Sequence, residues 1–316
     1  MQLPRIRLVR RQAALGAVLF ASALLAACTS GDSDRTAGSS DSARLSVVAS
    51  TSVIAEFARS VAGPDADVVT LVPPGADLHT YDPPVDAAKK IAQADVLLVN
   101  GCDLEHNLLD AIVLNRSDGS VLTVVGTLEG DEITGGDAAA VATARCDPHR
   151  WLDVRHAARY VDAIEQTFAA ADAMHAGGYQ ERAGAARAAL LALDDELRET
   201  LAVIPAERRR IVVLHDAFSY FAAAYDFELV ASILPTGSGQ EPSAGAVADV
   251  IELVRAQGVG AVFAEPQFPS RVVELVGEEA GARVLVLYSI PLPGETETYA
   301  AMMRANAQAL VAGLSE

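Results

Sequence analysis

Residues 71–84 read Leu71-Val-Pro-Pro-Gly-Ala-Asp-Leu-His79-Thr-Tyr81-Asp-Pro-Pro84. The run before them, residues 66–71, is typical of a β-strand, and the Pro-Pro-Gly that follows ends the strand and forces a turn. Because Pro83 and Pro84 close the loop, its backbone has few conformations, and His79 lies in the middle of it. This position is the carboxyl edge of a sheet, where open α/β sheets bind ligands. The alternative is a proline-rich surface turn with an incidental histidine.

Outward from this loop, short apolar runs alternate with helical patterns along the chain. The strand candidates are residues 45–50, 68–72, 95–99, 121–125, 211–214, 227–233, 261–264 and 283–287. A long helical pattern, residues 179–203, has leucines at helical spacing and ends at Pro205. Asp153 and Ser243 are expected to cap the helices that follow them. We therefore predict two (β/α) lobes with parallel sheets, a long rigid connecting helix and a ligand cleft between the lobes.

The first residues predict an export signal. Basic residues come first, and the apolar run at residues 13–27 is too short to span a membrane. It ends in Leu25-Ala-Ala-Cys28, which resembles a bacterial lipobox, in which the cysteine becomes the lipidated first residue of the mature protein. An ordinary signal peptide with a chance cysteine is the alternative.

The chain divides into five parts. Residues 1–27 are the lipoprotein signal peptide, and residues 28–43, rich in Ser, Gly, Asp and Thr, form a flexible tether. Residues 44–174 are the N-terminal α/β lobe, 175–204 the connecting helix and 205–316 the C-terminal α/β lobe. A lipid anchor with a tether suits a protein that is held at the outer face of the cell membrane and works in the aqueous phase.

The composition favours a cation as the ligand. The chain has 316 residues, of which 51% are hydrophobic, and a formal net charge of -18. The first 27 residues hold four arginines and no acid, so their removal makes the mature chain more acidic. Such a surface repels nucleic acid and anionic lipids, and we expect no nucleic-acid partner.

Three of the six histidines follow a strand or a proline turn: His79, His149 and His215. The first two belong to one half of the chain and the third to the other, which suits a cleft with ligands from both walls. Neutral imidazoles are common zinc ligands, and three leave a fourth position open. Trp151, the only tryptophan, lies two residues after His149 and is expected to shield the ligand; a core tryptophan next to a loop histidine is the alternative. The other three histidines lie in polar, helical surroundings and are expected to be solvated; they are His106, His156 and His175.

Six ordered segments resemble the metal-binding receptors of bacterial ABC importers for zinc or manganese. They are Val72-Pro-Pro-Gly-Ala-Asp-Leu-His79-Thr-Tyr81; Asn100-Gly101 with Leu104-Glu105; Asp147-Pro-His149-Arg-Trp151-Leu-Asp153; His215-Asp-Ala-Phe218-Ser-Tyr-Phe221; Glu241-Pro-Ser-Ala244; and Leu287-Tyr-Ser289 with Thr298-Tyr299 and Met302-Met303-Arg304-Ala305-Asn306. The resemblance covers almost everything from Arg44 onward.

The resemblance implies that His79, His149 and His215 bind one metal ion between the lobes. Histidine at the third position is typical of zinc receptors, so Zn²⁺ is expected rather than Mn²⁺. It also implies a partner permease of an ABC importer, and we expect a monomer. The family usually supplies an aspartate as a fourth ligand where this chain has Ile290. The candidates for the fourth ligand in this chain are water, Glu265 and Glu295.

Two cysteines remain once Cys28 is assigned to the lipid. Cys102 and Cys146 form an even pair in an oxidising compartment, so we predict a disulfide between them. A free thiolate that binds zinc is the alternative.

Three functions remain open at this point. The first is a lipid-anchored receptor that captures Zn²⁺ for an importer. The second is a zinc-dependent hydrolase, with three histidines, an open water position and Glu265 or Asp216 as the base, although no HExxH motif supports it. The third is a metal-binding, adhesin-like surface protein that keeps the fold without the transport role.

Overall fold

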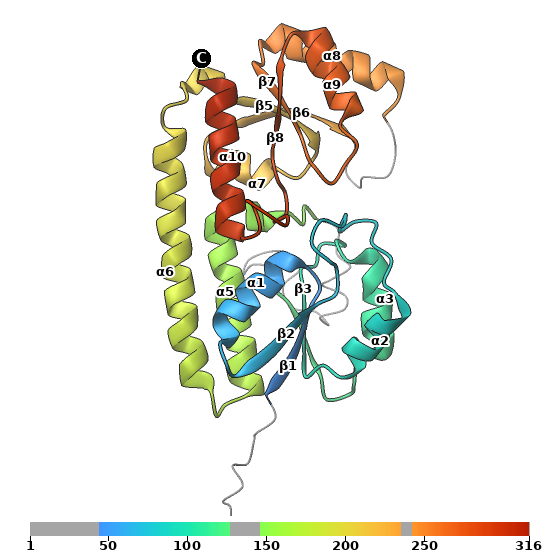
Figure 1. The fold of residues 1–316 in the computed structure, drawn as a ribbon, viewed down its shortest axis with the longest axis vertical. Coiled ribbons are helices and arrows are strands. Elements are labelled where there is room, and N and C mark those ends of the chain that lie inside the picture. The colour runs from blue at the N-terminus through green and yellow to red at the C-terminus, as the bar shows by residue number, and fades with distance from the viewer. Residues whose placement is uncertain (1–43, 127–145, 235–241, 316) are drawn as a thin grey trace, which may run out of the picture. The chain divides into compact units, whose positions relative to one another are not determined.

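Two four-stranded parallel sheets form the framework of the computed structural model, which describes residues 44–126, 146–234 and 242–315 (Figure 1). The first sheet has the order β2-β1-β3-β4 and the second the order β6-β5-β7-β8. Their strands are β1 (Leu45–Ala49), β2 (Ala66–Thr70), β3 (Val96–Val99), β4 (Val121–Val124), β5 (Arg210–His215), β6 (Glu228–Leu234), β7 (Ala261–Ala264) and β8 (Arg283–Val286). The prediction of two α/β lobes with parallel sheets is confirmed.

The central strands are apolar along their whole length. Every residue of β3 and of β7 is buried, as expected for parallel strands covered on both faces. In each sheet the order of the strands changes direction at the first strand. The second strand, β2 or β6, lies on one side of the first strand, β1 or β5, and the third strand, β3 or β7, lies on its other side. The carboxyl ends of β1 and β3 and of β5 and β7 are therefore the places where a ligand is expected.

Helices of the first lobe begin close to the strand ends. They are α1 (Ser52–Ala62), α2 (Val85–Ala92), α3 (His106–Asn115) and α5 (Val154–Ala171), with a short 3₁₀ helix, η1 (Arg150–Leu152), before α5. Asp153 caps α5 as predicted, because its carboxylate accepts a hydrogen bond from the backbone N–H of Arg155 at 2.8 Å. This cap sets the start of α5 directly after η1.

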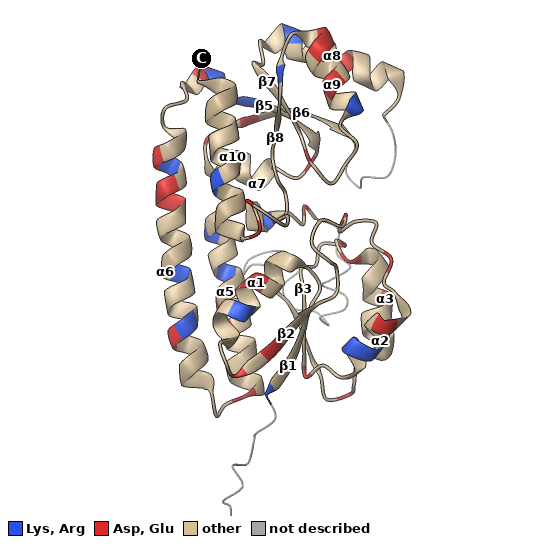
Figure 2. Cartoon of the chain, viewed as in Figure 1, with Lys and Arg blue, Asp and Glu red and all other residues tan. Residues whose placement is uncertain are grey.

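The long helix α6 (Ala176–Leu201) starts and ends two to three residues before the predicted range. With 26 residues it is about 39 Å long. It packs against α1 and α5 on one side of the molecule and against α10 (Tyr299–Leu314) further along (Figure 1). Both acidic and basic residues lie along it (Figure 2), which suits a helix with one face in water.

Helices of the second lobe are α7 (Ser219–Ala224), α8 (Ala244–Gln257), α9 (Arg271–Ala280) and α10, and η2 (Ala206–Arg208) precedes β5. Ser243 caps α8 as predicted, with its hydroxyl 3.2 Å from the N–H of Ala246. Gly277 in α9 permits close packing on β8, because a Cβ atom there would lie 2.4 Å from the side chain of Val284.

The lobes share one apolar core. A single cluster of buried side chains contains residues of both sheets and of α5, α6 and α10. At this junction the rings of Phe57 and Tyr299 lie 5.0 Å apart, and the carboxylate of Glu56 accepts the backbone N–H of Tyr299 at 2.8 Å. Residues 43–316 accordingly form one compact unit.

The predicted signal peptide, tether and lipidated Cys28 lie outside the described residues. Within the part of the chain that the structure describes, no helix combines the length and the apolar character needed to cross a bilayer.

Candidate metal site

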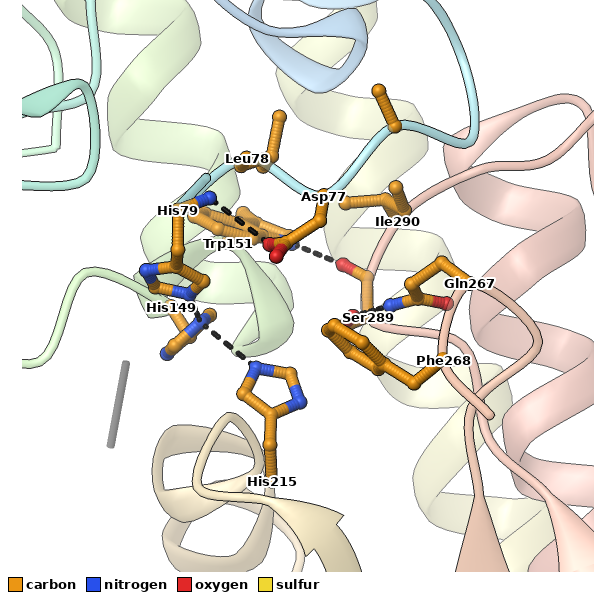
Figure 3. Close-up of a pocket in the computed structure, with 11 residues that line it drawn as sticks. Asp77, Leu78, His79, His149, Trp151, His215, Gln267, Phe268, Ser289 and Ile290 are labelled. Carbon is orange, nitrogen blue, oxygen red and sulfur yellow. Dashed lines mark hydrogen bonds between the residues drawn. The ribbon is translucent and has the colours of Figure 1, made fainter. Parts of the chain in front are cut away.

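The three predicted histidines lie together between the two lobes (Figure 3). His79 comes from the loop between β2 and α2, His149 lies just before η1, and His215 is the last residue of β5. Nε2 of His149 lies 3.2 Å from Nε2 of His79 and 3.4 Å from Nε2 of His215. All three ligand atoms lie within 4.8 Å of one another. Among the described residues, no other group of histidine, cysteine, aspartate or glutamate side chains is close enough to hold a metal ion.

Aspartates hold the two histidines of the first lobe in place. The carboxylate of Asp77 accepts the backbone N–H of His79 at 3.0 Å, and that of Asp147 accepts the backbone N–H of His149 at 3.0 Å. Both are turns in which an aspartate bonds the backbone two residues further on. The same Asp-x-His spacing stands twice in the sequence, and it is a signal from which these two supports could have been predicted.

Asn100 provides a second support for His149. Its side-chain amide donates to the carbonyl of Pro148 at 2.9 Å and accepts a hydrogen bond from the hydroxyl of Tyr160 at 2.7 Å. The buried carboxylate of Glu105 in turn accepts the backbone N–H of Asn100 at 2.6 Å. The Asn100-Gly101 and Leu104-Glu105 segments therefore position the backbone next to His149.

Each of the two buried imidazoles bonds to a carboxylate at the ring nitrogen that faces away from the other histidines. Nδ1 of His149 lies 2.9 Å from Asp147, and Nδ1 of His215 lies 2.5 Å from Glu265. A neutral imidazole that donates from Nδ1 carries an unprotonated lone pair on Nε2. Two such lone pairs, 3.4 Å apart, repel each other unless a proton or a cation lies between them. The arrangement therefore favours a cation.

The spacing of the ring nitrogens suits zinc. Ligand nitrogens about 2.05 Å from a tetrahedral zinc ion lie about 3.4 Å from one another. The two measured separations, 3.2 and 3.4 Å, match this value. The third, between His79 and His215, is at most 4.8 Å.

The environment favours the neutral forms of His79 and His149. Burial, followed by the positive charges that His149 and His215 would carry, lowers the pKa of His79 to about 4. Burial also lowers the pKa of His149, against the opposing hydrogen bond to Asp147. At neutral pH a metal ion therefore displaces few protons from these two side chains.

The cavity at the histidines is very small. Its volume is about 10 Å³, enough for one water molecule or one ion and far below that of an organic ligand. Aromatic and aliphatic side chains close it: Trp151 lies 5.3 Å from the ring of His149, Phe268 lies 5.2 Å from that of His215, and Ile290 lines the cavity. Phe268 is a lining residue that the sequence analysis did not predict.

The two carboxylates considered for the fourth position lie elsewhere. Glu265 is fully buried behind His215, where it bonds to Nδ1 of that ring, to the hydroxyl of Ser289 and to the amide of Gln267. Glu295 is exposed and does not line the cavity. Glu265 therefore orients a histidine instead of facing the cavity, and this geometry leaves water as the remaining candidate.

A disulfide joins Cys102 and Cys146, whose Cα atoms lie 4.9 Å apart. Because Cys146 lies three residues before His149, the bond ties the start of this segment to the loop after β3. Of the histidines predicted to be solvated, His106 is exposed, and His175 bonds to Asp172 at 2.6 Å. His156 differs from the prediction, because it packs against the ring of Tyr220 at 5.5 Å and is mostly buried.

A comparison with family models matches residues 47–313 to the family described as "Zinc-uptake complex component A periplasmic". The chain belongs to this family. Members of the zinc-uptake component A family are substrate-binding proteins of ABC metal importers and not enzymes, so the hydrolase alternative has no support.

Known relatives of this family align over nearly the whole chain. The manganese-binding lipoprotein MntA of Halalkalibacterium halodurans is 31% identical over 95% of this chain and 97% of its own. The iron-binding protein YfeA of Yersinia pestis is 30% identical over 88% of this chain and 89% of its own. The solved structure of the periplasmic zinc binding protein TroA from Treponema pallidum, 25% identical, has a TM-score of 0.77 and covers 86% of this chain and 100% of its own.

Proposed function

We propose that this protein is an extracytoplasmic, lipid-anchored receptor that captures Zn²⁺ for an ABC importer. His79, His149 and His215 bind the ion through Nε2, and a water molecule completes the tetrahedron. The observation that carries the proposal is the convergence of three ring nitrogens from both lobes within 4.8 Å of one another.

The donors in the cavity favour zinc over manganese. Imidazole nitrogen suits zinc, whereas manganese prefers carboxylate and water oxygens, and zinc binds more tightly than manganese to most sites. The only acid among the lining residues is Asp77, and its two oxygens already accept hydrogen bonds from the backbone of His79 and the hydroxyl of Thr80. The names of the relatives include manganese, iron and zinc proteins, so the preference rests on these donors.

Delivery to the membrane completes the proposed role. The lipobox-like segment supports lipidation of Cys28 and attachment to the outer face of the cell membrane, and the curated relative MntA is named a lipoprotein. We propose that the protein acts as a monomer and passes the ion to a permease of the importer.

Metal content and affinity test the proposal. Elemental analysis of the protein as isolated, and competition of Zn²⁺ and Mn²⁺ against a chromophoric chelator, are expected to give one zinc per chain and a clear zinc preference. Single alanine substitutions of His79, His149 and His215 are expected to weaken zinc binding strongly. His106→Ala, which removes an exposed histidine, is the matched control and is expected to bind as the wild type does. Unchanged affinity in the three site variants would refute the assignment.

A further inference from the structure

Ser289 lies between the two walls of the cavity and bonds to both (Figure 3). Its backbone carbonyl accepts the indole N–H of Trp151 at 2.7 Å. Its hydroxyl donates to Glu265 at 2.6 Å and accepts a hydrogen bond from the amide of Gln267 at 2.7 Å. Ser289 is only 3% exposed, so water does not replace these bonds easily.

These bonds connect a histidine of one lobe to a histidine of the other. Trp151 belongs to η1, two residues after His149, and packs against that ring. On the other side of Ser289, Glu265 reaches Nδ1 of His215 at 2.5 Å. The connection reaches His215 at Nδ1 and His149 through a ring contact, so it does not use Nε2 of either imidazole.

The hydroxyl of Ser289 determines how Glu265 is held. One oxygen of that carboxylate accepts from the hydroxyl and, at 3.1 Å, from Gln267, which leaves the other oxygen for Nδ1 of His215. A carboxylate fixed in this way selects the His215 tautomer with its proton on Nδ1 and its lone pair on Nε2. Without the hydroxyl, the oxygen of Glu265 that faces Ser289 loses its shorter hydrogen bond, and the carboxylate gains freedom to rotate.

We propose that Ser289 is a positioning residue that couples the two metal-binding walls, through Trp151 to the His149 segment and through Glu265 to His215. The inference rests on the proposed metal-binding function. The inference predicts that the two connections do not contribute independently to zinc affinity. Each connection supports the affinity only while the other keeps the two walls at the spacing that the ion requires.

The test uses the full-length protein and four variants. Ser289→Ala removes the hydroxyl and leaves the backbone carbonyl, Trp151→Phe removes the indole N–H and leaves an aromatic ring, and the double variant removes both. Ser289→Thr retains a hydroxyl and is the rescue. Zinc affinity and the rate of zinc release are measured by chelator competition, and the tautomer of His215 is read from ¹⁵N chemical shifts of its ring in metal-free protein at pH 7.5.

Thr167→Val is the matched control for a lost buried hydroxyl. Thr167 is buried and donates to the carbonyl of Ala163 at 2.8 Å, about 20 Å along α5 from its start. This variant is expected to lose stability without a change in zinc affinity or in the His215 signal.

For Ser289→Ala we expect about a tenfold loss of zinc affinity, faster release and a mixed His215 tautomer, because supports behind metal ligands typically contribute 10- to 100-fold in affinity. Ser289→Thr should restore the tautomer, and the double variant should lose less than the product of the two single losses. Wild-type affinity and tautomer in Ser289→Ala, strictly multiplicative losses, or an equal loss in Thr167→Val would each overturn the inference. A wild-type protein that binds no zinc would refute the proposed function instead, while the tautomer would still decide the role of Ser289.

Discussion

Replacing Cys102 and Cys146 together by alanine tests how much the disulfide stabilises the first lobe. The bond closes a loop with a sequence separation of 44 residues. In the loop-entropy description, a loop of this length restricts the unfolded chain by about 4 kcal/mol at 25 °C, within a measured range of roughly 2–5 kcal/mol. For a chain of this size, a loss of 4 kcal/mol lowers the melting temperature by about 7 °C.

The assay is urea unfolding of the metal-free protein, followed by far-UV circular dichroism and by the fluorescence of Trp151. The wild-type protein in reductant should approach the stability of the double variant, and the denaturant slope should rise as the unfolded chain gains freedom. A loss below about 0.5 kcal/mol, or a reductant effect that persists in the double variant, would refute the reasoning.

Three further predictions concern the site and its frame. The contribution of His79 to zinc affinity is measured as the ratio of the affinities of the wild type and His79→Ala. Because the pKa of His79 is about 4, this ratio should be unchanged from pH 7.5 to 5.5 and fall as the pH approaches 4. With an ordinary imidazole pKa of 6.5, the ratio would instead fall about tenfold at pH 5.5. Ile290→Asp places a carboxylate in the cavity wall and should raise Mn²⁺ affinity relative to Zn²⁺ in chelator competition; an unchanged ratio would count against the donor argument. Burial alone would raise the pKa of Asp194, but hydrogen bonds from Arg198 and Arg155 lower it. Asp194→Asn should therefore reduce the free energy of unfolding by about 2–3 kcal/mol at pH 7, measured by urea unfolding. The difference in stability between the wild type and this variant should vanish as the pH falls below 3.8 and Asp194 becomes protonated.

The sequence predicts where the histidines lie along the chain, because strand ends and prolines are local features. The proline-closed loop places His79, and the run of residues 211–214 places His215 at the end of β5. Parallel strands bring their carboxyl ends to one edge, so the convergence of these positions follows from the fold class.

The direction of each side chain does not follow from sequence position. Glu265 stands directly after β7, a place that suits a ligand, yet its carboxylate lies behind His215. The bond between Trp151 and Ser289 joins residues 138 positions apart and depends on how the lobes pack. The helix α9 was not predicted from the sequence, and the structure shows that its Gly277 allows close approach to β8.

X-ray absorption at the zinc edge of the purified, zinc-loaded protein tests the central claim most directly. We expect three imidazole nitrogens at about 2.0–2.1 Å and one oxygen, with one imidazole lost in each of the variants His79→Ala, His149→Ala and His215→Ala. A shell of five or six oxygens, a sulfur ligand, or a spectrum that stays the same in all three variants would contradict the account.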